Sequence, residues 1–160
     1  MGSKKIIFLF LGLLMPVLVF VFLRQCGKNQ FDVPLLHDQT VEAPGVCNYN
    51  YPIPYSLPDS IQSKLYNNTH PLTLLNFFGE QMKLTQISQE FDELQIVEER
   101  TIDLNADELE RIKTCFLLVK DTNMIVLVDQ DRRIRGYYDG NDLDELDRLE
   151  AEVKILLKRY

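Results

Sequence analysis

The sequence predicts an α/β domain in the form of a three-layer sandwich, preceded by one N-terminal transmembrane helix. Two observations lead to this prediction. Residues Ile6 to Leu23 contain no charged or strongly polar side chain. After residue 70, short apolar runs typical of strands alternate with segments in which apolar residues recur every three or four positions, as they do in amphipathic helices. We therefore expect a membrane anchor at 1–28, a linker at 29–70 and a folded domain at 71–160.

The N-terminal apolar segment is long enough for a single membrane span. Its 18 residues, at a rise of about 1.5 Å each, just cross a hydrocarbon core of about 30 Å. A cleaved signal peptide has a shorter apolar region and a small-x-small cleavage site, whereas here the span is followed by Arg24, Gln25 and Cys26. Lys4 and Lys5 directly precede the span, whereas Arg24 and Lys28 are spread over the residues that follow it. This bias predicts a single-pass protein of the inner (cytoplasmic) membrane, with the domain on the periplasmic side.

Composition excludes several classes of function. The 160 residues carry a net charge of −7 and include three Cys and two His. Such an acidic chain lacks the basic face that nucleic-acid binding requires, so we expect no nucleic-acid partner. So few Cys and His cannot supply a recognisable zinc or iron–sulfur framework. Four of the 17 basic residues flank the span, so the rest of the chain carries 13 basic against 24 acidic side chains, a net charge of −11.

The predicted linker is rich in proline and tyrosine. Between Phe31 and Ser60 lie five of the seven prolines of the chain and three tyrosines: Tyr49, Tyr51 and Tyr55. Proline at this density forbids a helix and favours extended chain. Two interpretations stay open, namely a semi-rigid spacer that holds the domain away from the membrane, and an aromatic segment that packs on the domain or on a partner.

The predicted domain has the element order strand, helix, strand, helix, strand, strand, helix. The expected elements are Leu72–Phe78, Met82–Leu94, Gln95–Ile102, a short helix after Asn105, Ile125–Val128, Ile134–Tyr138 and Asn141–Lys158. Asn105, with Glu108 three residues later, is typical of a capped helix start. The core stripe expected for the last helix is Leu143, Leu146, Leu149, Val153, Leu156 and Leu157. A right-handed βαβ unit followed by a hairpin and a helix is the thioredoxin-like order.

Two stretches resemble a known family. The run IVLVDQDRRIRGYYDG and the following NDLDELDRLEAEVKILL are similar to the C-terminal half of Sco/SenC proteins, and GKNQFDVPLL and VCNYNYPIPYSLPDSI fit the front of that family. Sco/SenC proteins are membrane-anchored thioredoxin-like copper chaperones of cytochrome oxidase assembly. The resemblance covers nearly the whole chain and implies the same anchor and fold.

The resemblance also implies three copper ligands, which this chain lacks. The family has a CxxxC pair just after the first core strand and a His before the hairpin. Here Gly79–Lys83 contains no Cys, and the position of the His falls at about Asp121, whose hard oxygen atoms suit Cu(I) poorly. No proline follows Pro71, so the cis-proline of thioredoxin-like oxidoreductases is absent too. We therefore expect a degenerate copper site with no catalytic residues, no metal ligands and no cofactor, in a protein that is not an enzyme.

The three cysteines leave one alternative open. Cys26 lies at the membrane edge, Cys47 in the linker and Cys115 near a core strand. A Cys47–Cys115 disulfide is possible in an oxidising compartment and would pin the linker to the domain, but the favoured interpretation of Cys115 is a small buried hydrophobe, which is what a free Cys usually is.

The remaining candidate ligands receive a structural interpretation. His37 and His70 are expected on the surface, Met82 in core packing, and the acidic run from Asp139 to Glu152 on a solvated helix face that can also dock a basic partner.

The leading functional hypothesis is an accessory or interaction factor in respiratory-oxidase and copper-site biogenesis, with a protein partner among oxidase assembly components. The alternative is a copper-binding or thiol-redox protein that uses Cys47 and Cys115. A third hypothesis is a membrane-anchored binding domain with no link to copper. Because fold does not carry function once site residues are lost, the link to oxidases rests on the family resemblance.

Overall fold

The computed structural model describes residues 12, 14–22, 32–79, 81–121 and 124–158. The chain divides into two units, 1–31 and Asp32–Tyr160. In the first unit, residues 14–22 are helical. Within the described residues, none of the helices has the length and apolar character that a bilayer crossing requires. The rest of the predicted span (6–11, 13 and 23), its flanking basic residues and Cys26 lie outside the described residues.

A four-stranded mixed sheet forms the centre of the second unit. Its strands are β1 (Leu72–Asn76), β2 (Leu94–Glu98), β3 (Met124–Asp129) and β4 (Ile134–Asp139), in the order β2-β1-β3-β4. Strands β1 and β2 run parallel, and β3 runs antiparallel to both of its neighbours, β1 and β4. The prediction that 125–128 is a central strand is confirmed. Burial on both faces explains why that segment is apolar at every position.

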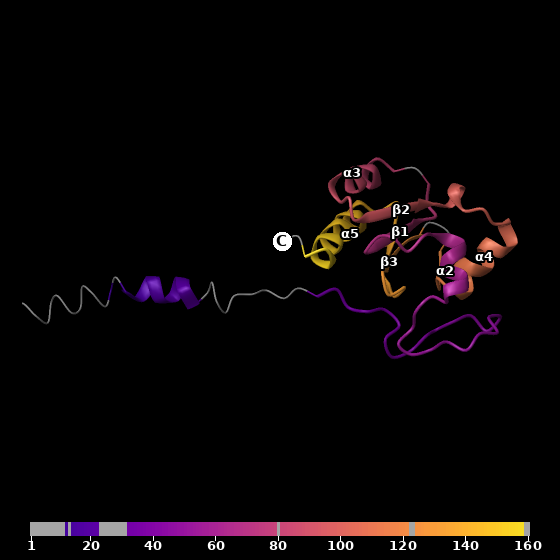
Figure 1. Cartoon of the computed structure of the whole chain (residues 1–160), viewed down its shortest axis with the longest axis horizontal. Coiled ribbons are helices and arrows are strands. Elements are labelled where there is room, and N and C mark those ends of the chain that lie inside the picture. The colour runs from indigo at the N-terminus through magenta and orange to yellow at the C-terminus, as the bar shows by residue number, and fades with distance from the viewer. Residues whose placement is uncertain (1–11, 13, 23–31, 80, 122–123, 159–160) are drawn as a thin grey trace, which may run out of the picture. The chain divides into compact units, whose positions relative to one another are not determined.

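Helices cover both faces of the sheet. They are α2 (Asp59–Leu65), α3 (Met82–Glu90), α4 (Ala106–Cys115) and α5 (Leu143–Leu156), with a 3-10 turn at Glu99–Thr101. Figure 1 shows α3 beside α5 and α2 beside α4. The predicted order is confirmed from β1 onwards, and α2 is an addition. The expected strand 95–102 ends at Glu98, where the chain enters the 3-10 turn and the Thr101 hydroxyl donates to the Glu98 carbonyl at 2.7 Å.

Two apolar clusters, one on each face of the sheet, form the core. One joins the sheet to α2 and α4 and includes Leu75 and Val126. The other joins it to α3 and α5 and includes Leu74 and Leu127. Since neighbouring residues of a strand point to opposite faces, the two buried central strands supply both clusters. The domain is therefore a mixed α/β structure of three layers.

The proline-rich segment belongs to the second unit. Residues 33–58, here called the strap, run across the domain, and Val33, Tyr55 and Leu57 are buried. The Leu36 amide donates to the Ile134 carbonyl at 3.2 Å, so the strap partly covers the free edge of β4. The sequence assigned this segment to a linker at 29–70 and left two interpretations open. In the structure, the segment packs on the domain.

The strap is free of helix, as its prolines require. Helix α2 begins only at Asp59, directly after Pro58. Proline is tolerated at this boundary because the first turn of a helix has no intrahelical partner for its amides.

The predicted N-terminal cap of α4 is confirmed, whereas one residue predicted for the core face of α5 is exposed. The Asn105 side chain accepts from the Glu108 amide at 2.8 Å, as predicted. Leu146, Leu149 and Val153 are buried in α5 as expected. The expectation that Leu143 is also buried is wrong: its side chain is 71% exposed, because α5 begins at this residue and only its following turns pack on the sheet.

This difference within one stripe gives a test of the fold. We expect Leu149→Ala to lower the free energy of unfolding by about 2–5 kcal/mol, because it leaves a cavity in a fully buried cluster. Leu143→Ala, at an exposed position of the same helix, should change it by less than about 0.5 kcal/mol. Urea unfolding followed by circular dichroism measures both. Equal losses in the two variants would contradict the placement of α5.

Candidate functional site

The loop after β1, where the family resemblance places a cysteine pair, is closed by its own hydrogen bonds. The Asn76 carboxamide accepts from the Phe78 amide at 3.0 Å and donates to the Gly79 carbonyl at 2.6 Å. Gly79 has a φ of 107°, a left-handed conformation that favours glycine. Helix α3 then begins at Met82. Asn76 is 2% exposed, so its side chain serves this turn and is not available to a ligand.

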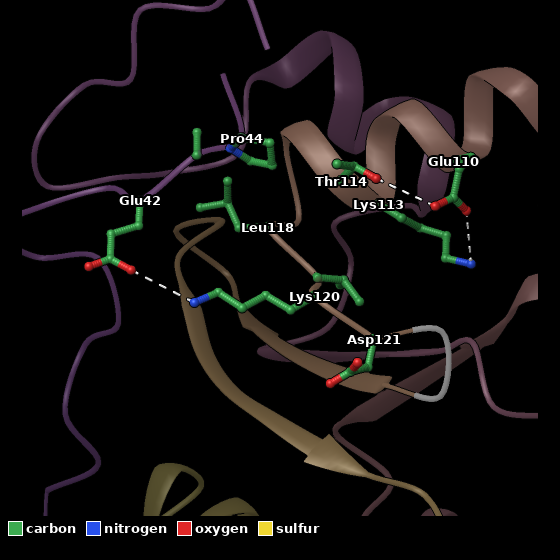
Figure 2. A pocket seen from close by; sticks show the side chains of 10 residues that line it. Glu42, Pro44, Glu110, Lys113, Thr114, Leu118, Lys120 and Asp121 are labelled. Atoms are coloured by element: carbon green, nitrogen blue, oxygen red, sulfur yellow. Dashed lines mark hydrogen bonds and ion pairs between the residues drawn. The ribbon is translucent and has the colours of Figure 1, made fainter. Parts of the chain in front are cut away.

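Asp121, at the position expected for the histidine, lines a surface cavity of about 460 Å³ between the strap and the chain after α4. Figure 2 shows its carboxylate there, together with two opposite-charge contacts. Lys120 Nζ lies 3.7 Å from Glu42 Oε2, and Lys113 Nζ lies 3.5 Å from Glu110 Oε2. Among the described residues, no group of three His, Cys, Asp or Glu side chains is arranged to hold a metal ion.

His37 belongs to the strap, and its side chain is half-buried rather than free on the surface. Its Nε2 is 2.9 Å from the Tyr137 hydroxyl, which donates its proton to the Leu117 carbonyl at 2.8 Å. The hydroxyl can therefore only accept from the imidazole, which assigns the ring proton to Nε2. Burial lowers the pKa of His37 below its usual 6.5, although a backbone hydrogen bond with Thr40 opposes that shift.

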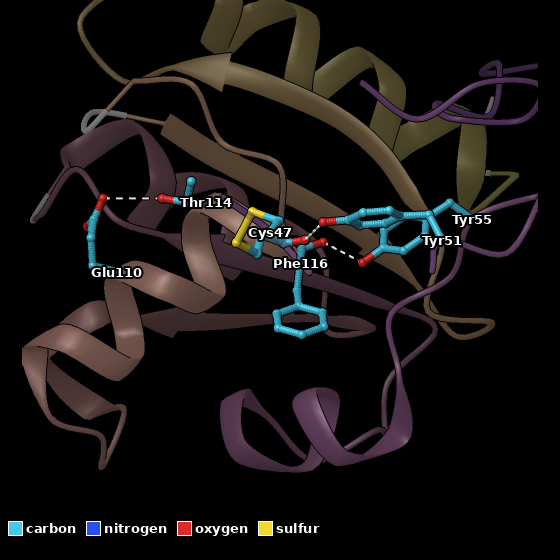
Figure 3. The surroundings of a disulfide bond; sticks show 7 residues. Cys47, Tyr51, Tyr55, Glu110, Thr114 and Phe116 are labelled. Carbon is cyan, nitrogen blue, oxygen red and sulfur yellow. Dashed lines mark hydrogen bonds between the residues drawn. A yellow bond between two sulfur atoms is a disulfide. The ribbon is translucent and has the colours of Figure 1, made fainter. Parts of the chain in front are cut away.

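Cys47 and Cys115 are joined in a disulfide, so the pairing that the sequence left open is present. Their Cα atoms are 5.5 Å apart, and the bond links the strap to the last residue of α4 across 68 positions. Figure 3 shows this bond beside Phe116, with Tyr51 and Tyr55 reaching the same chain segment. Both cysteines of the second unit are thus held in a covalent cross-link.

Two strap tyrosines reinforce the disulfide. The Tyr51 hydroxyl donates to the Cys115 carbonyl at 2.8 Å, and the Tyr55 hydroxyl donates to the Phe116 carbonyl at 2.7 Å. Carbonyls at a helix C-terminus lack intrahelical partners, so these hydroxyls satisfy the end of α4. Burial raises the pKa of Tyr55 well above its usual value, which keeps the phenol protonated as a donor.

Sequence reasoning missed this capping role. The available signal was a pair of tyrosines, Tyr51 and Tyr55, that flank prolines in an extended segment beside a cysteine. The carbonyls that they reach lie more than sixty residues away, and no local pattern indicates such a distant acceptor.

The remaining predicted residues are dispersed. The expectation that Met82 packs in the core is wrong, because its side chain is 82% exposed at the start of α3. His70 shares a hydrogen bond of 2.9 Å with the hydroxyl of the neighbouring Thr69. In the acidic run, Glu145 and Glu152 pair with Arg148 on their own helix. These contacts satisfy surface charges and do not gather a site.

Neither a protein-family model nor a curated protein matches the chain. The resemblance to Sco/SenC proteins therefore stays a hypothesis that rests on the sequence runs quoted above.

The disulfide should contribute strongly to stability. We expect Cys47→Ser to lower the free energy of unfolding of the oxidised protein by about 4 kcal/mol, because the cross-link closes a 68-residue loop in the unfolded chain. Urea unfolding with and without reductant measures the effect. The variant itself should be insensitive to reductant. An unchanged unfolding midpoint in Cys47→Ser would show that the cross-link does not constrain the unfolded chain.

His37 should make the stability depend on pH. Because its folded pKa lies below the unfolded value of 6.5, the unfolded state binds protons first as the pH falls. Its contribution is therefore complete above pH 6.5 and is lost as the pH drops through the folded pKa. Unfolding measured at about pH 7.5 and about pH 5.5 should show this loss, and His37→Gln should reduce it. An NMR titration that places the folded pKa above 6.5 would contradict the assignment.

Proposed function

We propose that this chain is a membrane-anchored, Sco-like protein whose thioredoxin-like domain is a non-catalytic accessory or interaction factor in the biogenesis of respiratory oxidases and their copper sites. One observation carries the proposal. The positions that would hold the copper ligands lie in a domain of suitable topology, and they are occupied by a self-closed turn and by Asp121.

The sheet topology supports the thioredoxin-like part of the proposal. A parallel β1–β2 pair joined through α3, followed by an antiparallel β3–β4 hairpin and a terminal helix, is the arrangement expected from the sequence. The sheet also has helices on both faces. These features fit the fold that the family resemblance implies.

The state of the cysteines supports a role without copper or thiol chemistry. Thiolates, and not disulfide sulfurs, are the ligands and nucleophiles of such chemistry. In the second unit both cysteines are consumed by a cross-link between the strap and α4. The neighbouring tyrosines use the same region to satisfy helix carbonyls. The cysteines and tyrosines are therefore arranged as a structural attachment of the strap to α4.

The disulfide also supports an oxidising location. Structural disulfides persist in the periplasm and in secreted proteins and are rare in the cytosol. This agrees with a single N-terminal span in the inner membrane and a domain on the periplasmic side, which we propose from the apolar run Ile6 to Leu23 and its flanking charges.

A second candidate function is favoured by one observation. Cys47 is only partly buried, and its Cα lies 5.5 Å from that of Cys115. If a dithiol partner reduced the bond, its first thiolate would form a mixed disulfide with one cysteine and release the other. Its second thiolate would then release the first cysteine and close the partner's own disulfide, which leaves two adjacent thiols in this chain. Such a pair supplies two soft thiolate ligands, which suit a two-coordinate Cu(I) site. The two candidates differ in a single measurable property, which is copper affinity.

A Cu(I) titration separates the candidates. Full-length protein in detergent, carrying Cys26→Ser and reduced under anaerobic conditions, is titrated with Cu(I) against a competing chelator. We expect no competition with the chelator beyond that of the same protein with Cys47→Ser and Cys115→Ser added, because the described residues place no third metal-ligating side chain beside the pair. Stoichiometric Cu(I) binding that is lost in either serine variant would replace the leading proposal with the relocated site.

The link to oxidases is tested in membranes from cells that lack the chain. We expect lowered oxidase activity that added copper does not restore, since the proposed role is not metal delivery. Restoration by copper, or unchanged activity, would count against the accessory role in oxidase assembly.

A further inference from the structure

An open groove lies beside the disulfide, between the strap and α4. It has a volume of about 540 Å³, and its lining includes Val46, Tyr49, Phe116, Asp107, Glu110 and Arg111. Val46 is 85% exposed and Tyr49 is 37% exposed, although both are large apolar side chains. Apolar side chains that gather in one concave site are typical of a binding surface, whereas singly scattered ones are ordinary.

The apolar wall of the groove is held in place. The Tyr49 ring packs edge-on against Phe116, with ring centroids 5.2 Å apart, and against Tyr51 at 5.0 Å. Tyr51 is in turn bonded to the Cys115 carbonyl, and the disulfide fixes the strap next to it (Figure 3). A surface whose rings are already ordered loses little entropy when a ligand binds.

The charges around the groove favour a basic ligand. Asp107 and Glu110 project from the first turns of α4, and Arg111 contributes one positive charge to the lining. Lys113 Nζ lies 3.5 Å from the Glu110 carboxylate and 3.6 Å from Glu99, so Glu110 is already paired within the domain. The chain outside the anchor carries a net charge of −11. Its field therefore attracts basic segments and repels acidic proteins and anionic lipid.

We propose that this groove docks a segment of a partner protein that inserts an aliphatic or aromatic side chain between Val46, Tyr49 and Phe116. The segment also carries a Lys or Arg beside that side chain, and this cationic group approaches the carboxylate of Asp107. The inference rests on the proposed role as an interaction factor, and it specifies the surface and the chemistry of the partner.

Matched substitutions are available for the test. Val46→Ser removes an exposed apolar side chain from the groove, and Leu143→Ser removes one from the start of α5, where it is 71% exposed. Asp107→Asn and Asp144→Asn each remove an acidic group at the second residue of a helix. The two substitutions of each pair should lower the free energy of unfolding by similar amounts. A difference in peptide affinity within a pair is therefore due to the groove.

The probe is a dye-labelled peptide with a Leu-Phe pair flanked by lysines, and its counterpart has glutamates in place of the lysines. Fluorescence anisotropy with oxidised full-length protein in detergent gives the Kd. We expect Val46→Ser to raise the Kd for the lysine peptide by about 5–10-fold, because a buried valine contributes to binding in proportion to its apolar area. Asp107→Asn should raise it by about 2–5-fold and weaken its dependence on salt. Leu143→Ser and Asp144→Asn should leave it unchanged.

Several results would overturn the proposal. They are no binding of the lysine peptide, equal binding of the glutamate peptide, or equal losses in the groove and control variants. A dimer in sedimentation that Val46→Ser dissociates would assign the groove to a second copy of the chain instead. The Cu(I) titration is independent of these outcomes. If the lysine peptide does not bind in the groove and the protein does not bind Cu(I), the proposed function stands and only the groove proposal fails. Tight Cu(I) binding overturns the proposed function whether or not the peptide binds.

Discussion

The attachment of the strap to the end of α4 is the interaction on which the rest of the domain's surface depends. A disulfide from Cys47 and hydroxyl donors from Tyr51 and Tyr55 converge on residues 115 and 116. Within the strap, the Cys47 amide donates to the Pro44 carbonyl and the Tyr55 amide to the His37 carbonyl, but a proline-rich chain has no regular backbone ladder, so contacts with the domain must fix its position. Its fixed position covers part of the β4 edge, half-buries its own His37 and creates the groove.

Much of the fold could be predicted because its signals are local. The runs that form the central strands are mainly apolar because helices cover both faces of the sheet. The start of α4 is indicated by the capping pair Asn105 and Glu108. Errors occurred where tertiary packing decides. Periodicity placed Leu143 in the core stripe, but a helix can extend past the layer that it covers. A thioether such as Met82 was expected inside, although its position at the first residue of α3 exposes it.

The candidate site was less accessible to sequence reasoning than the fold. The absence of Cys and His at the family's ligand positions can be read directly from the sequence. The pairing of Cys47 with Cys115 cannot, because it depends on a contact across 68 residues that no short pattern encodes. The capping tyrosines and the groove depend on that same contact. Residues between the prolines therefore looked like linker, although they form one wall of the domain.

The strap also imposes an order on biosynthesis. Its partners all come later in the chain: Cys115 and Phe116, then Arg132 and Ile134 in the hairpin. Synthesis runs from the N-terminus. The strap is therefore the first part of the domain to be translated and the last to be attached to it. Until α4 and the hairpin have emerged and the cysteines have been oxidised, that segment has nothing to hold it. Completion of this surface thus requires both that the chain has emerged as far as the hairpin and that Cys47 and Cys115 have been oxidised.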